Sequence, residues 1–205
     1  MRRILGIAVV LIFTCAVGQA LAASDSVATD LEAAQAALRE NMDLGGSLAG
    51  APATQEQAEK AAQLLKEGLA KARACTSAQP RLAGAHHTIG MLLVFAYRPI
   101  ESKVTTTGSD GVVHEETMTV LSRGSAADAD EGLAELRAAT KLAPAEIGYQ
   151  LDYAEALGAC GEASAASGLL NALWMRQADM TATQRAQASR LLARWAGLPS
   201  TPKTC

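Results

Sequence analysis

The side chains best suited to bind a metal ion are two adjacent histidines, His86 and His87, and the acidic run Asp128, Asp130 and Glu131. Both histidines fall in a helical pattern, where neighbouring side chains point about 100° apart, so the pair cannot face one ion. The acidic run stands where a helix is predicted to begin, and carboxylates there complement the positive end of the helix macrodipole. We therefore expect no bound metal.

Asp152 and Glu155 form the one carboxylate pair suited to general acid–base catalysis, three residues apart on a predicted helix. No nucleophile and no water-excluding aromatic wall accompanies this pair. The sequence also lacks a Ser-His-Asp order, a phosphate-binding loop, a nucleotide-binding glycine pattern and a zincin motif. We expect a protein without catalytic activity and without a cofactor.

The amino-acid composition of the chain disfavours one class of partner, nucleic acid. The chain has 21 acidic and 18 basic residues, and aromatic residues make up 3% of it. Such a chain offers neither a basic face for phosphates nor aromatic platforms for bases, which disfavours nucleic acid as a partner. Alanine and leucine dominate instead, as is typical of closely packed helices.

The first 22 residues have the organisation of a secretory signal peptide. Two arginines follow Met1, residues 4–17 are apolar, and residues 20–22 are Ala-Leu-Ala, the small-x-small pattern that precedes a cleavage site. We expect cleavage after Ala22 and a periplasmic or secreted mature protein. The alternative is a lipoprotein acylated at Cys15, for which Thr14 is a poor preceding residue. No later stretch reaches the ~20 apolar residues of a membrane helix, so no integral membrane span is expected.

Seven helices are expected after the signal peptide. The capping patterns that mark helix starts are Thr29-x-x-Glu32, Thr54-x-x-Gln57, Ser125-x-x-Asp128 and Thr181-x-x-Gln184. Gly45 and Gly46 end the first helix, Pro80 falls in the first turn of the third, and Pro99 stops the third after Tyr97.

The segment 98–125 differs in composition from the helices around it. Residues 103–107 and 112–121 are rich in β-branched side chains, and a Gly-Ser-Asp-Gly loop separates them. This pattern predicts a β-hairpin inserted between two helices. A two-stranded hairpin is marginal in water by itself, so it should lean on the helices or on a partner.

A period of 34 residues relates two of the helices. Gly132 corresponds to Ala166, Leu136 to Leu170 and Ala139 to Leu173. The helices that precede them fit the companion pattern of small and apolar residues, as Gln150-x2-Tyr153-Ala154-x2-Leu157 and His86-x2-Ile89-Gly90-x2-Leu93. With its period and this pairing, the chain resembles a degenerate tetratricopeptide repeat (TPR) protein.

The resemblance implies an all-α fold for residues 23–197, a TPR-like α-solenoid of about three antiparallel helix pairs with a closing helix and the hairpin insertion; residues 198–205 form a tail. It implies that a protein or peptide binds in a groove lined by the first helix of each pair. The groove residues carried over are His87, Met91, Val94, Leu151 and Glu155. His86 takes the place of the family's tryptophan and should pack between helices, whereas His87 either contacts a ligand in the groove or is exposed to solvent.

The same arrangement would bring Cys160 close to Cys205, so we expect these two to form a disulfide and Cys75 to remain outside it. Two further classes stay open beside the binding module. One is a structural or assembly subunit of the cell envelope that oligomerises through the hairpin. The other is a protein that binds a small ligand or a metal ion.

Overall fold

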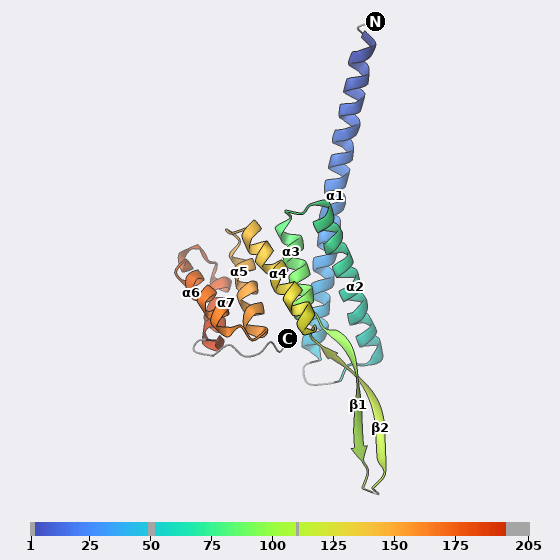
Figure 1. Cartoon of the computed structure of the whole chain (residues 1–205), viewed down its shortest axis with the longest axis vertical. Helices are drawn as coiled ribbons and strands as arrows, with labels where there is room; N and C mark the ends of the chain where they lie inside the picture. Colours follow the sequence, from blue (N-terminus) through green and yellow to red (C-terminus); the bar gives the residue numbers. More distant parts are fainter. Residues whose placement is uncertain (1–2, 49–51, 110, 196–205) are drawn as a thin grey trace.

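The computed structural model describes residues 3–48, 52–109 and 111–195, with side chains from residue 24 onward. Within these ranges the chain is mostly helical and carries one two-stranded hairpin, as the sequence predicts (Figure 1). The elements are α1 (Arg3–Ser47), α2 (Gln55–Ala78), α3 (Ala83–Phe95), β1 (Arg98–Thr107), β2 (Val113–Ser122), α4 (Ala126–Leu142), α5 (Ile147–Ala159), α6 (Ala163–Trp174), the short 3-10 helix η1 (Gln177–Asp179) and α7 (Ala182–Trp195).

Successive helices pack as antiparallel pairs. In the first pair, Asp30 of α1 meets Lys71 of α2 at 2.8 Å, and Glu40 meets Lys60 at 2.6 Å. Residue numbers on α2 therefore fall as those on α1 rise, which fixes the antiparallel direction. The pairs α3–α4 and α5–α6 follow along the body in Figure 1, and α7 lies beside the last pair.

The first helices of the pairs, together with α7, run side by side in the same direction. Gly84 of α3 lies against both Leu31 of α1 and Tyr149 of α5. At the other end of these helices, Trp195 of α7 covers Gly158 of α5. Side chains from α1, α3, α5 and α7 can therefore meet on one surface.

Small residues stand at the close helix crossings, as predicted. A Cβ atom at Gly90 would lie 2.5 Å from Cγ of Leu136 and 2.8 Å from the carbonyl oxygen of Gly132, so no side chain fits there. Ala154 of α5 and Ala166 of α6 are both fully buried. Interiors are packed at nearly crystalline density, and a small residue is what lets two helix backbones approach this closely.

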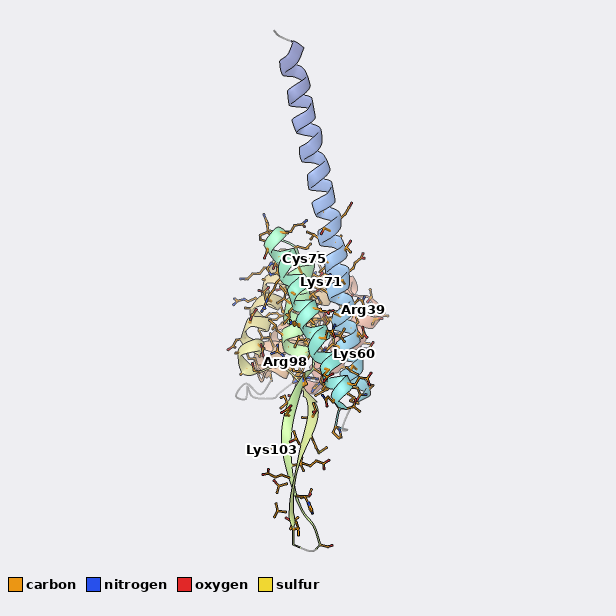
Figure 2. All side chains as sticks on the ribbon, turned by 90° about the vertical axis from the view of Figure 1, so that its right-hand side faces the viewer. Arg39, Lys60, Lys71, Cys75, Arg98 and Lys103 are labelled. Atoms are coloured by element: carbon orange, nitrogen blue, oxygen red, sulfur yellow. The ribbon has the colours of Figure 1, made fainter. Side chains whose placement is uncertain are left out.

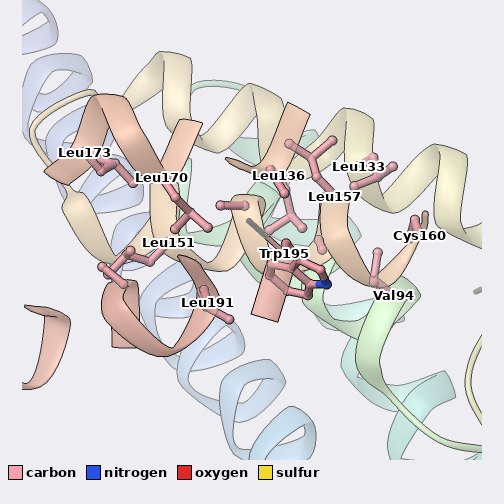
Figure 3. Packing of buried hydrophobic residues seen from close by; sticks show 14 of the residues in the cluster. Val94, Leu133, Leu136, Leu151, Leu157, Cys160, Leu170, Leu173, Leu191 and Trp195 are labelled. Atoms are coloured by element: carbon pink, nitrogen blue, oxygen red, sulfur yellow. The ribbon is translucent and has the colours of Figure 1, made fainter. Parts of the chain in front are cut away.

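The core divides around α3. Leu93 packs with Ala34 of α1 and Ala72 of α2, whereas its neighbour Val94 belongs to a larger cluster formed with α4 to α7. Figure 3 shows this larger cluster, which contains leucines of α4, α5, α6 and α7 together with Trp195. The two faces of α3 thus serve two different parts of the core.

Two predicted helix boundaries are wrong. Thr29 does not cap α1, because the helix begins upstream and the Thr29 hydroxyl donates to the Asp25 carbonyl within it, 2.9 Å away. Pro80 lies in the turn before α3, which starts at Ala83. In contrast, the capping boxes at Thr54 and Ser125 are both formed.

The hairpin leaves the body between α3 and α4 and projects away from the helices (Figures 1 and 2). Its strands pair antiparallel from Arg98 opposite Ser122 to Thr107 opposite Val113. At its root, Arg98 bonds Asp128 of α4 at 2.7 Å. No helix in the described part of the chain is both long and apolar enough to cross a membrane.

Candidate functional site

A histidine–carboxylate contact joins α3 to α5. His87 Nε2 lies 2.9 Å from Asp152 Oδ2, and because a carboxylate can only accept, the imidazole donates. The His87 ring also stacks on Tyr149, with 4.3 Å between ring centroids and 21° between planes. His87 therefore has a partner for its nitrogen and another for its ring face, which fixes its orientation.

A glutamine of α7 extends this contact to a third helix. The side-chain amide of Gln187 donates to Asp152 Oδ1 at 3.3 Å and to Glu155 Oε2 at 3.5 Å. The polar side chains thus run without interruption across α3, α5 and α7. We call this set, made of His87, Tyr149, Asp152, Glu155 and Gln187, the polar seam.

The helical repeat of α5 accounts for the central members of the seam. Tyr149, Asp152 and Glu155 follow one another at intervals of three, so they occupy one stripe of the helix. Gly84 of α3 leaves the space that the Tyr149 hydroxyl approaches, since a Cβ atom there would be 3.4 Å from this oxygen. A side chain larger than that of alanine at position 84 would therefore crowd the phenol.

The seam is half-buried and rich in acceptors. The side chains of His87 and Asp152 keep 16% and 26% of their surface exposed. Burial, with help from the charges of Glu146 and Asp152, raises the pKa of Tyr149, so its hydroxyl stays protonated. Two carboxylates at the surface of the seam can accept hydrogen bonds from amide, ammonium or guanidinium groups of a ligand.

The structure brings two of the predicted groove residues together and separates others from the surface. His87 and Glu155 both lie in the seam, and Met91 is half-buried, where it packs against the larger core cluster and against a further small cluster that contains Leu92. Val94 and Leu151 are 2% and 0% exposed, so assigning them to the groove was wrong. Both point into the core, because α4 covers one side of α3 and the C-terminal helices cover α5.

Two seam residues were not predicted from the sequence, and a third was predicted for another role. The sequence indicates Asp152 only as half of a possible acid–base pair, and it does not indicate Tyr149 or Gln187 as site residues. The three-residue spacing of Tyr149, Asp152 and Glu155 was the signal that could have placed them on one stripe. Nothing local marks Gln187, because its role depends on where α7 packs.

Comparisons with protein-family models, with curated proteins and with solved structures find no match for this chain. Within residues 24–48, 52–109 and 111–195, no three His, Cys, Asp or Glu side chains gather closely enough to hold a metal ion.

Neither Cys75 nor Cys160 belongs to the seam. Cys75 is a free, buried thiol on α2 whose Sγ donates to the carbonyl of Val27 at 3.4 Å. Cys160 is disulfide-bonded. Cys205, its predicted partner, lies outside the described residues, so the pairing stays a prediction.

Proposed function

We propose that this chain is an exported, TPR-like helical module that binds a peptide or protein on the face formed by α1, α3, α5 and α7, without catalysis. The observation that carries the proposal is the polar seam, which links side chains of three parallel helices into one surface. A ligand lying across these helices would meet acceptors from more than one of them. Solenoid proteins use such shared faces for recognition.

Packing at the 34-residue period supports a TPR-like arrangement. The equivalent residues Gly132 and Ala166 are both buried, as are Leu136 and Leu170. The same positions of two successive pairs therefore make the same kind of contact, which is how a stacked repeat buries a continuous core.

Export is part of the proposal, and the periplasm or the extracellular space is the proposed location. Cleavage after Ala22 would leave the part of α1 that packs against α2, since Val27 accepts from Cys75 and Asp30 pairs with Lys71. The mature chain would keep both of these contacts between α1 and α2.

The test is capture of a partner by the mature chain, residues 23–205, followed by measurement of the dissociation constant with purified partner or a peptide from it. Because the seam supplies two carboxylates, the double variant D152N/E155Q should bind about tenfold more weakly or worse. The matched control is E59Q/E67Q, which removes two exposed carboxylates from α2. If the seam variant binds the partner with the same affinity as the wild type, the proposal is wrong.

The projecting hairpin favours a second candidate function, that of an assembly subunit. The insertion is longer than a connection between adjacent helices needs, and both of its strands lie at an edge of the sheet. Exposed strand edges pair readily with other strands. Deleting residues 103–121 separates the two candidates. Loss of self-association with retained partner capture would support the assembly role, and the reverse would support binding on the helical face.

A further inference from the structure

The backbone of the hairpin leaves two edges open. At the loop, the Gly108 N–H donates to the Val112 carbonyl at 2.8 Å, and Gly111 adopts a left-handed φ of 78°. Hydrogen-bonded and non-bonded pairs alternate in an antiparallel ladder, so the bonded pairs of β1 and β2 are the even-numbered residues. The odd-numbered residues of β1, from Glu101 to Thr107, therefore direct their N–H and C=O groups away from β2.

Within the described residues, most of the hairpin projects beyond the helices (Figure 1). A groove of about 650 Å³ separates its root from α2 and reaches no farther than Glu101 and Thr117. A second groove, on the opposite face, ends at Val104 and Met118. A ribbon of two strands is marginally stable in water, and three or more strands are needed for independent stability. The outer part of this ribbon therefore lacks the support that a stable sheet requires.

Apolar side chains are exposed along the same ribbon. Among the described residues, five large hydrophobic side chains are exposed, and three of them belong to the hairpin or its loop. These are Ile100, Val112 and Val113, which are 46%, 49% and 60% exposed. Of the three, Ile100 lies on β1, and an exposed apolar side chain beside an open strand edge indicates a surface that another strand covers.

We propose that this other strand is β1 of a second copy, paired antiparallel about a twofold axis at Ser102, so that two hairpins form one four-stranded sheet in the order β2–β1–β1–β2. The inference rests on the assembly role and is independent of peptide binding at the polar seam.

Charge complementarity selects this register. With Ser102 on the axis, Glu101 of each copy stands opposite Lys103 of the other, which gives two cross-strand ion pairs. If the twofold axis moves by one residue, to Lys103 or to Glu101, Lys103 stands opposite Lys103 or Glu101 stands opposite Glu101. Like charges directly opposite each other are destabilising. On the other face of the sheet, Ile100 meets Val104 twice.

The open edge of β2 is less suited than that of β1 to pairing with a second copy. β2 carries Glu115 and Glu116 and no lysine or arginine along its paired length, so two copies of β2 have no ion pair to form. In Figure 2, Lys103 stands out on the projecting ribbon, well away from the helices. It is free to reach a second copy, since its contact with Glu115 is long, at 3.8 Å, and both side chains are mostly exposed.

Cross-linking at the axis tests the pairing directly. Ser102 would face its own copy in a non-hydrogen-bonded pair, where Cα atoms lie about 4.5 Å apart, within disulfide reach. The mature C75S/S102C chain should form a covalent dimer under mild oxidation. The control is C75S/T106C, because residue 106 would stand opposite Arg98, and the two introduced thiols would be roughly 26 Å apart. Absence of the S102C cross-link, or equal cross-linking of both variants, overturns the proposal.

Charge exchange at the same edge provides a second test, read by sedimentation equilibrium of the mature chain. Each of E101K and K103E should raise the dimer dissociation constant on the order of tenfold, because each turns two attractive pairs into two repulsive ones. Mixing the two variants should restore association as a heterodimer, and E101K/K103E should restore the homodimer. E116K, the same charge change on β2, is the control.

Backbone hydrogen bonding can be tested independently of charge. Thr105→Pro removes an N–H from the proposed interface edge, and Thr117→Pro removes one from the opposite edge, so each should leave the hairpin formed. Only Thr105→Pro should weaken the dimer. A wild-type chain that is monomeric at all concentrations would overturn both this inference and the assembly role. A dimer indifferent to the β1 variants would overturn this inference alone.

Discussion

His86 Nδ1 lies 2.5 Å from Glu135 Oε2, which joins α3 to α4 through a half-buried contact. The other ring nitrogen lies 3.0 Å from the Pro80 carbonyl oxygen. Both neighbours are acceptors, so only the doubly protonated imidazolium can donate to both. Burial by itself lowers the pKa of His86, but the bonds to Pro80 and Glu135 and the charge of Glu135 outweigh it, so the net shift is upward.

The upward shift predicts a pH-dependent stability. A pKa raised on folding contributes stability that is complete below the unfolded value, about 6.5, and is lost as pH rises through the folded value. The free energy of unfolding should therefore fall between pH 6.5 and the higher folded pKa, and H86Q should flatten that fall. Urea denaturation over a pH series measures both chains. H114Q, on the exposed hairpin, is the control, and parallel wild-type and H86Q profiles would contradict the prediction.

Asn41→Ala should destabilise the chain by about 2–3 kcal/mol, because it leaves buried backbone groups without a partner. Asn41 is fully buried, donates to the carbonyls of Ala61 and Tyr97, and accepts from the Tyr97 N–H at 2.7 Å. Denaturant unfolding provides the measurement. The control Asn171→Ala removes an exposed amide on α6 and should change stability little. Similar values for the two variants would show that the Asn41 bonds contribute nothing.

Gly90→Ala should destabilise the α3–α4 crossing by about 1–3 kcal/mol or more, because the added methyl group meets Leu136 and the backbone of Gly132. The matched control is Gly168→Ala on α6, where a Cβ atom meets nothing within 4 Å. There the better helix propensity of alanine should stabilise the chain by up to about 1 kcal/mol. Thermal or urea unfolding distinguishes the two signs, and a stabilised Gly90→Ala would contradict the close approach.

Cys75 should react with thiol reagents far more slowly in the native chain than in urea. Burial, followed by the charge of Asp30, raises the pKa of this thiol, so little of the reactive thiolate forms near neutral pH. Labelling followed by mass spectrometry measures the rate. In C75S/S77C the thiol moves to an exposed position of the same helix and should label quickly. Rapid labelling of native Cys75 would mean that α1 separates readily from α2.

Local features of the fold were predictable from the sequence, and side-chain direction was less so. Capping boxes, the Gly-containing hairpin loop and small residues at helix crossings depend on a few adjacent residues, and these predictions held at Thr54, Ser125 and Gly90. Val94 failed because its surroundings are set by α4, which follows it only after the hairpin. Leu151 failed because distant helices cover its side of α5.

The candidate site was predictable to about the same extent. His87 and Glu155 were predicted for one groove and do lie in one seam, but the residues that join them come from the middle of α5 and from α7. No motif links Gln187 to His87 across the chain. Their association follows from the parallel course of the helices, which is a tertiary property.

Adjacent residues on α3, Leu93 and Val94, belong to different core clusters. This helix therefore separates two parts of the core and contributes side chains to both. Truncation of the chain from either end would remove the helices that cover one face of α3 and expose its apolar side chains to water. Fragments cut on either side of α3 should therefore aggregate when they are expressed separately.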